Sequence, residues 1–488
     1  MMMVWMGLAT MVHAQRTDIV PMLKTQWGQG NPYNMQCPVK NGKHCQTGCV
    51  ATAMAQVMRY YECPKDEFAW SLMQDTYDTN TSATDESAQA VAALMAACGT
   101  AVNMDYGVST SAAWEGDAAV ALSEQFGYAS SVREVFRNMY GRTAWENLIY
   151  HELAKGRPVI YGGMPSGFAH QFVCDGYNDG KFHFNMAWQF MPDGYYAVDA
   201  LDRYPDGQTA IVGICLPNEA MNLVGEEFVW NGLRCKVTDK DEVWVCAIEK
   251  GATVSELTIP SSVEWQDRTF RVTGIDYSAF EDCTTLTHLT IPASVEVLGR
   301  RFVLGCQQLT DLSVEDDNPW YLVEDGVLRT ATELLAYPMT KTTPTYRIPD
   351  GIGDIPASLF RGNVWLERVE IPADVTTIDI LAFRGCTGLR TIVSENTTPR
   401  AIEDLAFDDD TYATATLIVP PGTTNKYKRL AGWKLFSHIE EATTDISVPS
   451  ASTSSPHTRY QLNGTTAPTA EGITIDADKG RKYYLRRK

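Results

Sequence analysis

The sequence of 488 residues contains no Cys-x-x-Cys pair and no His-Glu-x-x-His motif, so we expect no metal site and no zinc peptidase. Its 12 cysteines are too dilute for a disulfide-stapled fold. No apolar run beyond the N-terminus is long enough to cross a bilayer, so no membrane span is predicted. Basic residues are in the minority, with 40 Lys and Arg against 60 Asp and Glu and a formal net charge of −20. Because such a surface repels phosphate backbones, nucleic acid is not an expected partner.

The N-terminus carries an apolar stretch at residues 4–12, followed by the small-residue cleavage signal Val12-His13-Ala14. This pattern predicts a secretory signal peptide over residues 1–14, with a buried first helix as the alternative. We therefore expect a secreted protein or one on the bacterial cell surface. Export would permit a disulfide between Cys37 and Cys45, and two free thiols are the alternative.

Beyond the signal peptide, the sequence falls into four regions with different residue patterns. Residues 15–217 mix helical and strand patterns, and residues 218–442 consist of short β-like pieces that recur. Residues 443–458 are rich in Ser, Thr and Pro, which predicts a linker. Residues 459–488 are expected to form a small β tail module.

The second region repeats itself. Leu286 returns as Leu309 and Leu366 returns as Leu389, each 23 positions later, with an Ile-Pro pair and a Gly-Cys pair at fixed offsets. This period predicts a leucine-rich-repeat solenoid of five or six units, in which stacked neighbours share one core. Three cysteines are expected to point into that core as small apolar residues: Cys283, Cys306 and Cys386.

Residues 49–61 place apolar side chains on one helical stripe, and Gly48 permits a sharp turn into that helix. Cys49 would then stand in the first turn, where free N–H groups and the helix dipole favour a thiolate. The pattern is that of a primed nucleophile, although a lone cysteine that opens an Ala-rich helix is more often part of the core.

His170 follows a Gly-rich loop at residues 162–167 and leads into a strand-like run. A histidine at such a strand start can exchange a proton near neutral pH. The turn signal at residues 178–180 predicts a hairpin with a strand over residues 182–188, which carries Asn185 and Trp188. These residues fit the general arrangement of nucleophile, base and orienting group.

Several short motifs, found in one order over residues 23–216, resemble those of streptopain-family peptidases, which are papain-like in fold. They lie at residues 29–34, 48–53, 102–107, 170–176, 193–196, 199–201 and 210–214. The repeats are similar to BspA-like leucine-rich repeats of bacterial surface proteins, and residues 227–259 resemble the β-unit that often precedes them.

The resemblance implies roles for particular residues. Cys49 matches the family nucleophile and His170 the family histidine, while Gln29 matches a glutamine that helps the Cys49 N–H hold an oxyanion. Asn185 and Trp188 fall on the family's Asn-Trp-Gly-Trp run, which here is altered by a methionine and an alanine. Phe168-Ala169 stands where the family has two glycines. No prodomain is expected between the signal peptide and Gln29.

We therefore expect an α+β chain with a papain-like peptidase domain, a leucine-rich-repeat solenoid and a short β tail. The predicted function is that of a cysteine endopeptidase without a cofactor. It would act on protein or peptide substrates and use its repeats to bind substrate or a host or surface protein. One alternative is a catalytically impaired surface adhesin that acts through its repeats. Another is acyl transfer of the transglutaminase kind.

Overall fold

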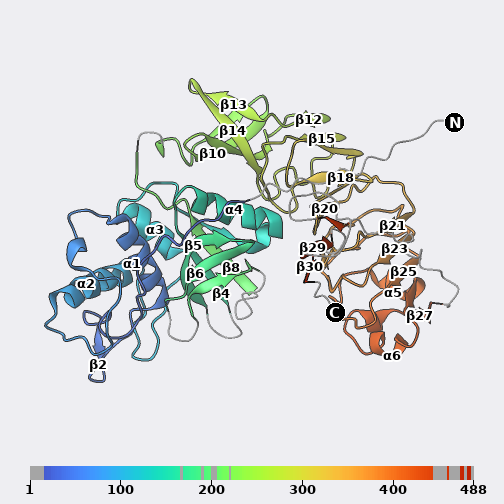
Figure 1. Ribbon diagram of the computed structural model, residues 1–488. Helices are drawn as coiled ribbons and strands as arrows, with labels where there is room; N and C mark the ends of the chain where they lie inside the picture. Colours follow the sequence, from blue (N-terminus) through green and yellow to red (C-terminus); the bar gives the residue numbers. More distant parts are fainter. Residues whose placement is uncertain are drawn as a thin grey trace.

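The computed structural model describes residues 16–164, 169–187, 192–198, 206–218 and 221–442, and the backbone of three short strands near the C-terminus. The signal peptide and the linker predicted from the sequence lie outside the described residues. The N-terminal part of the chain and the repeats lie side by side, with a β-unit above them (Figure 1). No helix among the described residues is long and apolar enough to cross a membrane.

The N-terminal part is built on a six-stranded antiparallel sheet in the order β3-β8-β4-β5-β6-β7. The predicted hairpin is present, because β5 and β6 are joined by a turn in which Asp179 and Gly180 both have positive φ. The strands are β3 (Arg133–Phe136), β4 (Val159–Met164), β5 (His170–Asn178), β6 (Lys181–Asn185), β7 (Gly194–Tyr196) and β8 (Asp206–Val212).

Helices cover both faces of this sheet. Ile160 and Val173 pack against the helices α1 to α3 on one face. Their sequence neighbours Val159 and Phe172 face the opposite way and pack with α4. This alternation, with a period of two, makes the central strands apolar throughout. The helices are α1 (Cys49–Tyr61), α2 (Glu86–Ala101), α3 (Asp117–Glu124) and α4 (Arg142–Ala154), with a small hairpin of β1 (Val39–Lys40) and β2 (Lys43–His44) nearby.

The β-unit that precedes the repeats is a mixed sheet in the order β13-β14-β11-β10-β9, with β16 paired to β14. Its strands are β9 (Glu227–Trp230), β10 (Leu233–Asp239), β11 (Glu242–Ile248), β13 (Ser262–Trp265), β14 (Arg268–Ile275) and β16 (Val297–Leu298). Because β16 belongs to the first repeats, this sheet and the solenoid share one core.

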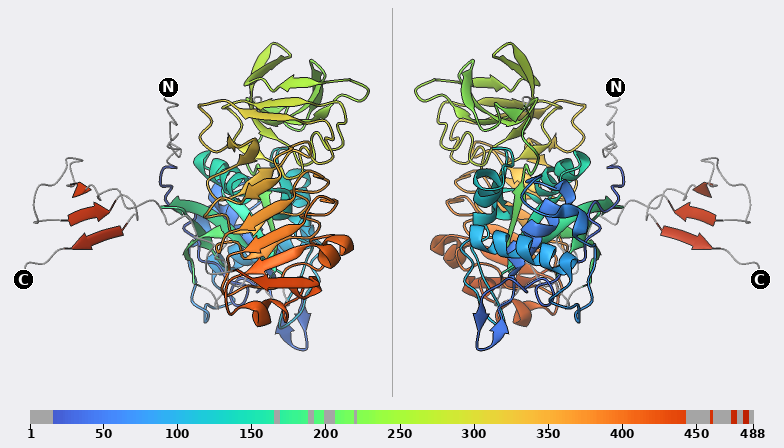
Figure 2. Two further views of the ribbon diagram at one scale, coloured as in Figure 1. Left: turned by 90° about the vertical axis from the view of Figure 1, so that its right-hand side faces the viewer. Right: turned by 90° about the vertical axis from the view of Figure 1, so that its left-hand side faces the viewer.

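The solenoid has the predicted 23-residue period. His288 pairs with Asp311, and Arg368 pairs with Thr391, in parallel strands. Figure 2 shows these strands stacked in a ladder. The parallel strands are β12 (Glu256–Thr258), β15 (His288–Ile291), β17 (Asp311–Val314), β21 (Thr345–Arg347), β22 (Asp354–Ile355), β23 (Arg368–Ile371), β24 (Thr377–Ile378), β25 (Thr391–Ser394), β26 (Thr416–Val419) and β27 (His438–Glu441).

An antiparallel insertion interrupts the ladder between two blocks of repeats. It consists of β18 (Leu322–Glu324), β19 (Val327–Arg329) and β20 (Leu334–Ala336). Short helices, α5 (Asp409–Thr414) and α6 (Thr424–Tyr427), close the far end. The C-terminal strands β28 (Arg459–Tyr460), β29 (Ile473–Asp476) and β30 (Arg481–Tyr484) pair antiparallel, as expected for a β tail module.

The cysteines behave as small apolar residues in the repeats. Cys306 and Cys386 are buried, and each thiol donates to a backbone carbonyl one repeat away, at 3.1 Å. Cys283 is half-buried. Cys37 and Cys45 are buried and carry free thiols, which is the alternative to the disulfide considered from the sequence.

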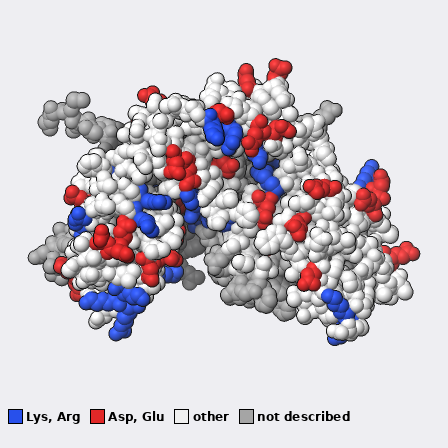
Figure 3. Space-filling model, turned by 180° about the vertical axis from the view of Figure 1, so that it is seen from behind, with Lys and Arg blue, Asp and Glu red and all other residues white. Residues whose placement is uncertain are grey.

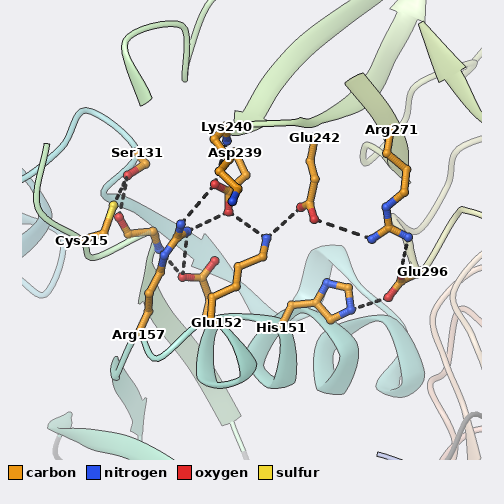
Figure 4. A network of polar contacts seen from close by, with 12 residues as sticks. Ser131, His151, Glu152, Arg157, Cys215, Asp239, Lys240, Glu242, Arg271 and Glu296 are labelled. Carbon is orange, nitrogen blue, oxygen red and sulfur yellow. Dashed lines mark hydrogen bonds and ion pairs between the residues drawn. The ribbon is translucent and has the colours of Figure 1, made fainter. Parts of the chain in front are cut away.

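Hydrogen bonds at the two ends of helix α4 attach the sheet to the β-unit and the repeats. The carboxylate of Glu333, in the insertion, accepts the N–H groups of Arg142 and Thr143 and so caps the N-terminus of α4. Just beyond its other end, Arg157 donates to both oxygens of Asp239 at 2.8 and 3.1 Å, and Lys155 reaches the same carboxylate at 2.7 Å (Figure 4). Both ends of α4 are therefore tied to the C-terminal half of the described chain.

The network continues from Lys155 to Glu242 at 2.9 Å and from Arg271 to Glu296 at 2.8 Å, and His151 pairs with Glu296 (Figure 4).

On the face of the molecule in Figure 3, acidic and basic side chains are interspersed rather than gathered into one large patch. The excess of negative charge in the sequence is thus distributed over this face.

We expect Asp239 to contribute much of the stability of the contact between the end of α4 and the β-unit. Burial alone raises its pKa, but Arg157 and Lys155 outweigh burial and hold the pKa well below its usual range. We predict that Asp239→Asn lowers stability by about 3 kcal/mol at pH 7, because it leaves two cations without their shared carboxylate. A carboxyl with a depressed native pKa stabilises above its unfolded value and loses that effect in acid, so the difference should shrink below about pH 4.

Thermal unfolding of the unaltered chain and of Asp239→Asn, at pH 7 and at pH 3, measures this difference in stability. The matched control is Asp241→Asn, which removes an exposed carboxylate two positions away. Equal losses for the two variants at pH 7 would contradict the assignment of the attachment to Asp239.

Candidate active site

Cys49 is the first residue of α1, as the sequence predicts. The turn before it requires glycine, because Gly48 has φ +86° and a Cβ there would lie 2.6 Å from the Cε of Met104. The helix that follows is buried from Val50 to Met58, between the other helices and the sheet. Tertiary packing therefore fixes where the half-buried Cys49 side chain stands.

His170 is the first residue of β5, and β5 packs directly against α1. The side chain is buried, with 4% of its surface exposed. The backbone N–H of Gln171, the residue that follows His170, interacts with the Cys49 thiol, and this contact by itself lowers the pKa of the thiol. The fold thus brings Cys49 to the start of the strand that His170 opens, although the two residues are far apart in the sequence.

The His170 ring is oriented by a backbone carbonyl. Its Nε2 lies 2.9 Å from the oxygen of Met186. A carbonyl oxygen can only accept, so Nε2 must carry the proton of the neutral ring. The lone pair then resides on Nδ1, which is the nitrogen able to take a proton.

The Met186 peptide is itself held on its other side. Its N–H donates to Oδ1 of Asp193 at 2.7 Å. The next residue, Ala187, adopts φ +51°, a conformation that the glycine of the resembling motif would adopt without strain. The Met186 side chain is buried in the core on the α4 side of the sheet. Sequence reasoning missed the roles of Met186 and Asp193, because a backbone carbonyl carries no sequence signal.

Asn185 lies close to this turn, but its side chain is engaged elsewhere. Its Oδ1 accepts from Nε2 of Gln56 at 3.1 Å and its Nδ2 donates to the carbonyl of Thr25 at 2.6 Å. The third contact is with the N–H of Ala187 at 3.3 Å. None of these bonds involves the His170 ring. Asn185 therefore holds β6 against α1. The other two residues considered from the sequence, Trp188 and Phe168, lie outside the described residues.

Gln29 is anchored beside the segment that enters α1. Its carbonyl accepts the N–H of Thr47 at 3.1 Å, two residues before Cys49. The half-buried Gln29 lines an open hollow of about 470 Å³ together with Asn185 and Asp193. We call this hollow the groove; Gly28 and Ala187 also line it.

Burial shifts the two candidate catalytic groups in opposite directions. Burial raises the pKa of the Cys49 thiol, and the N–H groups of Gln171 and Val50 offset this only in part. Burial lowers the pKa of His170, while the hydrogen bond to Met186 raises it. Both net shifts favour a neutral thiol beside a neutral imidazole. The thiolate expected from the helix dipole alone is thus opposed by desolvation.

Comparisons with known proteins agree with this layout. Residues 27–196 match the Peptidase C10 family, and residues 251–320 and 338–429 match six copies of the BspA type leucine rich repeat region. Streptopain of Streptococcus pyogenes is 33% identical over 240 residues, which cover 38% of this chain and 60% of streptopain. The thiol protease/hemagglutinin PrtT of Porphyromonas gingivalis is 30% identical over 271 residues, covering 46% of this chain and 31% of PrtT.

The solved structure of active interpain A cysteine protease from Prevotella intermedia is 33% identical. The match covers 40% of this chain and 95% of interpain A, with a TM-score of 0.38. The chain contains a domain of the Peptidase C10 family, which is followed by BspA type leucine rich repeats.

Proposed function

We propose that the chain is a secreted cysteine endopeptidase that hydrolyses peptide bonds in proteins, with Cys49 as nucleophile and His170 as base. The observation that carries the proposal is the placement of Cys49 at the start of α1, beside the backbone that follows His170. The ring of His170 presents Nδ1 as its basic nitrogen, because Nε2 is bonded to the carbonyl of Met186.

In this mechanism His170 Nδ1 takes the Cys49 proton as the sulfur attacks the peptide carbonyl. The Cys49 N–H and the Gln29 side chain hold the negative oxygen that develops. His170 then gives its proton to the leaving amine, which breaks the peptide bond and leaves a thioester. Water, with His170 again as base, hydrolyses the thioester.

The repeats serve to bind substrate or a surface protein in this proposal. The attachment through α4 supports such a role, since the bonds of Glu333 and Asp239 tie the repeats and the β-unit to the sheet. The name of PrtT joins a protease with a hemagglutinin, which supports activity outside the bacterial cell.

A catalytically impaired adhesin is the second candidate, and the packing of Met186 argues against it. The tryptophan of the resembling motif is replaced by Met186, whose side chain lies in the core rather than at the groove. Its carbonyl still orients His170, so this departure leaves the ring's hydrogen bond in place.

Cys49→Ala should abolish cleavage of denatured protein substrates, because no other group in this arrangement can form the thioester. The loss should be at least about 10³-fold in kcat/KM. Gel and mass-spectrometric assays of the purified chain measure it. The control is Cys63→Ala, a half-buried cysteine just beyond the far end of α1, which should retain activity. Equal cleavage by Cys49→Ala and the unaltered chain would reject the proposal.

The acid limb of kcat/KM should fall below pH 6.5. The neutral His170 ring is the base, and burial lowers its pKa below the ordinary value of about 6.5, so protonation removes the base only in more acidic solution. A pH profile with an uncharged peptide substrate measures this. His44→Gln removes an exposed imidazole on β2 and should not move the limb. A limb at or above pH 6.5 would contradict the proposed burial effect.

A further inference from the structure

Glu115 lies at the seam between the helices and the sheet, two residues before α3 begins. Its Oε2 accepts the hydroxyl of Thr209 on β8 at 2.7 Å. A Cβ on Gly162 of β4 would lie 2.8 Å from the same oxygen, so the carboxylate rests over a position without a side chain. Gly162 and Thr209 are direct neighbours across the two strands.

The register of the sheet places this carboxylate near the candidate catalytic pair. Gly162 pairs with Gln171, and the next residue, Gly163, pairs with His170. Ile160, two residues earlier on the same face of β4, is in the core beneath α1. Glu115 therefore covers the end of that core which adjoins His170, and its charge acts on the Cys49 sulfur.

The Glu115 carboxylate is poorly compensated. Within the described ranges it forms no ion pair, and the hydroxyl of Thr209 is its hydrogen-bond donor. Burial raises the pKa of Glu115, as expected for a partly desolvated acid without a cation. The charge of another carboxylate, Glu134, raises the pKa of Glu115 further.

A second acceptor nearby lacks a donor. Gln171, opposite Gly162 on β5, is 1% exposed, and its Oε1 has no hydrogen-bond partner in the part of the chain that the structure describes. Buried acceptors are normally satisfied, so two under-supplied acceptors flanking one glycine favour a ligand rich in donors. A guanidinium group offers five N–H donors and a positive charge, and an ammonium group offers three.

We propose that Glu115 is a specificity-determining residue that binds the Arg or Lys side chain of a substrate residue close to the scissile bond. This inference rests on the proposed peptidase function and names the class of peptide that the site prefers.

The test compares matched fluorogenic peptides that carry arginine or citrulline at each of the two positions on either side of the scissile bond. Citrulline has nearly the same shape as arginine and no charge. At one position the unaltered enzyme should cleave the arginine peptide with a kcat/KM about tenfold higher. In Glu115→Gln this ratio should fall to about one.

Glu134→Gln is the matched control, because it removes the same charge from the neighbouring strand β3. It should keep the preference for arginine. An equal loss of preference in both variants would mean that the general negative potential selects the substrate, which overturns the role of Glu115. If Glu115→Gln does not fold, the unaltered enzyme still decides, since a ratio of one at all four positions overturns the inference.

The same assay separates the two levels of the proposal. Cleavage that depends on Cys49 but shows no arginine preference rejects the role of Glu115 and leaves the peptidase function standing. The absence of any Cys49-dependent cleavage, with folded protein and both peptide series, rejects both.

Discussion

The candidate site depends on the burial of α1 against β5. The helix is buried from Val50 to Met58, so it is held by apolar packing on all sides rather than by hydrogen bonds of its first residue. A shift of one residue along the helix axis would move the Cys49 sulfur by about 1.5 Å. Proton transfer between two side chains requires hydrogen-bond distance, and therefore the core beneath the site sets its precision.

Orientation of the imidazole depends on backbone groups. The carbonyl of Met186 bonds to His170, and the N–H of the same residue is held by Asp193. Since the side chain at position 186 points into the core, its identity can change from the motif's tryptophan to methionine without loss of this bond. Ala187 at φ +51° costs about 1 kcal/mol relative to glycine, and the surrounding hydrogen bonds hold it there.

The sequence predicted those features that arise from local periodicity. Helix α1 and the 23-residue spacing follow from apolar patterns, and the β5–β6 turn follows from an Asn-Asp-Gly signal. The capping of α4 by Glu333 could not be predicted, because the two elements are about 190 residues apart. The raised pKa of Cys49 was equally hidden, since it depends on how much water the complete fold removes from the sulfur.

The mounting of the repeats relative to the groove has a consequence for how they could act. Helix α4 packs on the face of the sheet opposite to α1, and the bonds of Glu333 and Asp239 secure that face. The attachment is therefore on the far side of the sheet from the helix that carries Cys49. A protein held by the repeats would have to reach around an edge of the sheet to enter the groove. In the function proposed above, an extended segment of a bound protein could follow this path more readily than a compact domain.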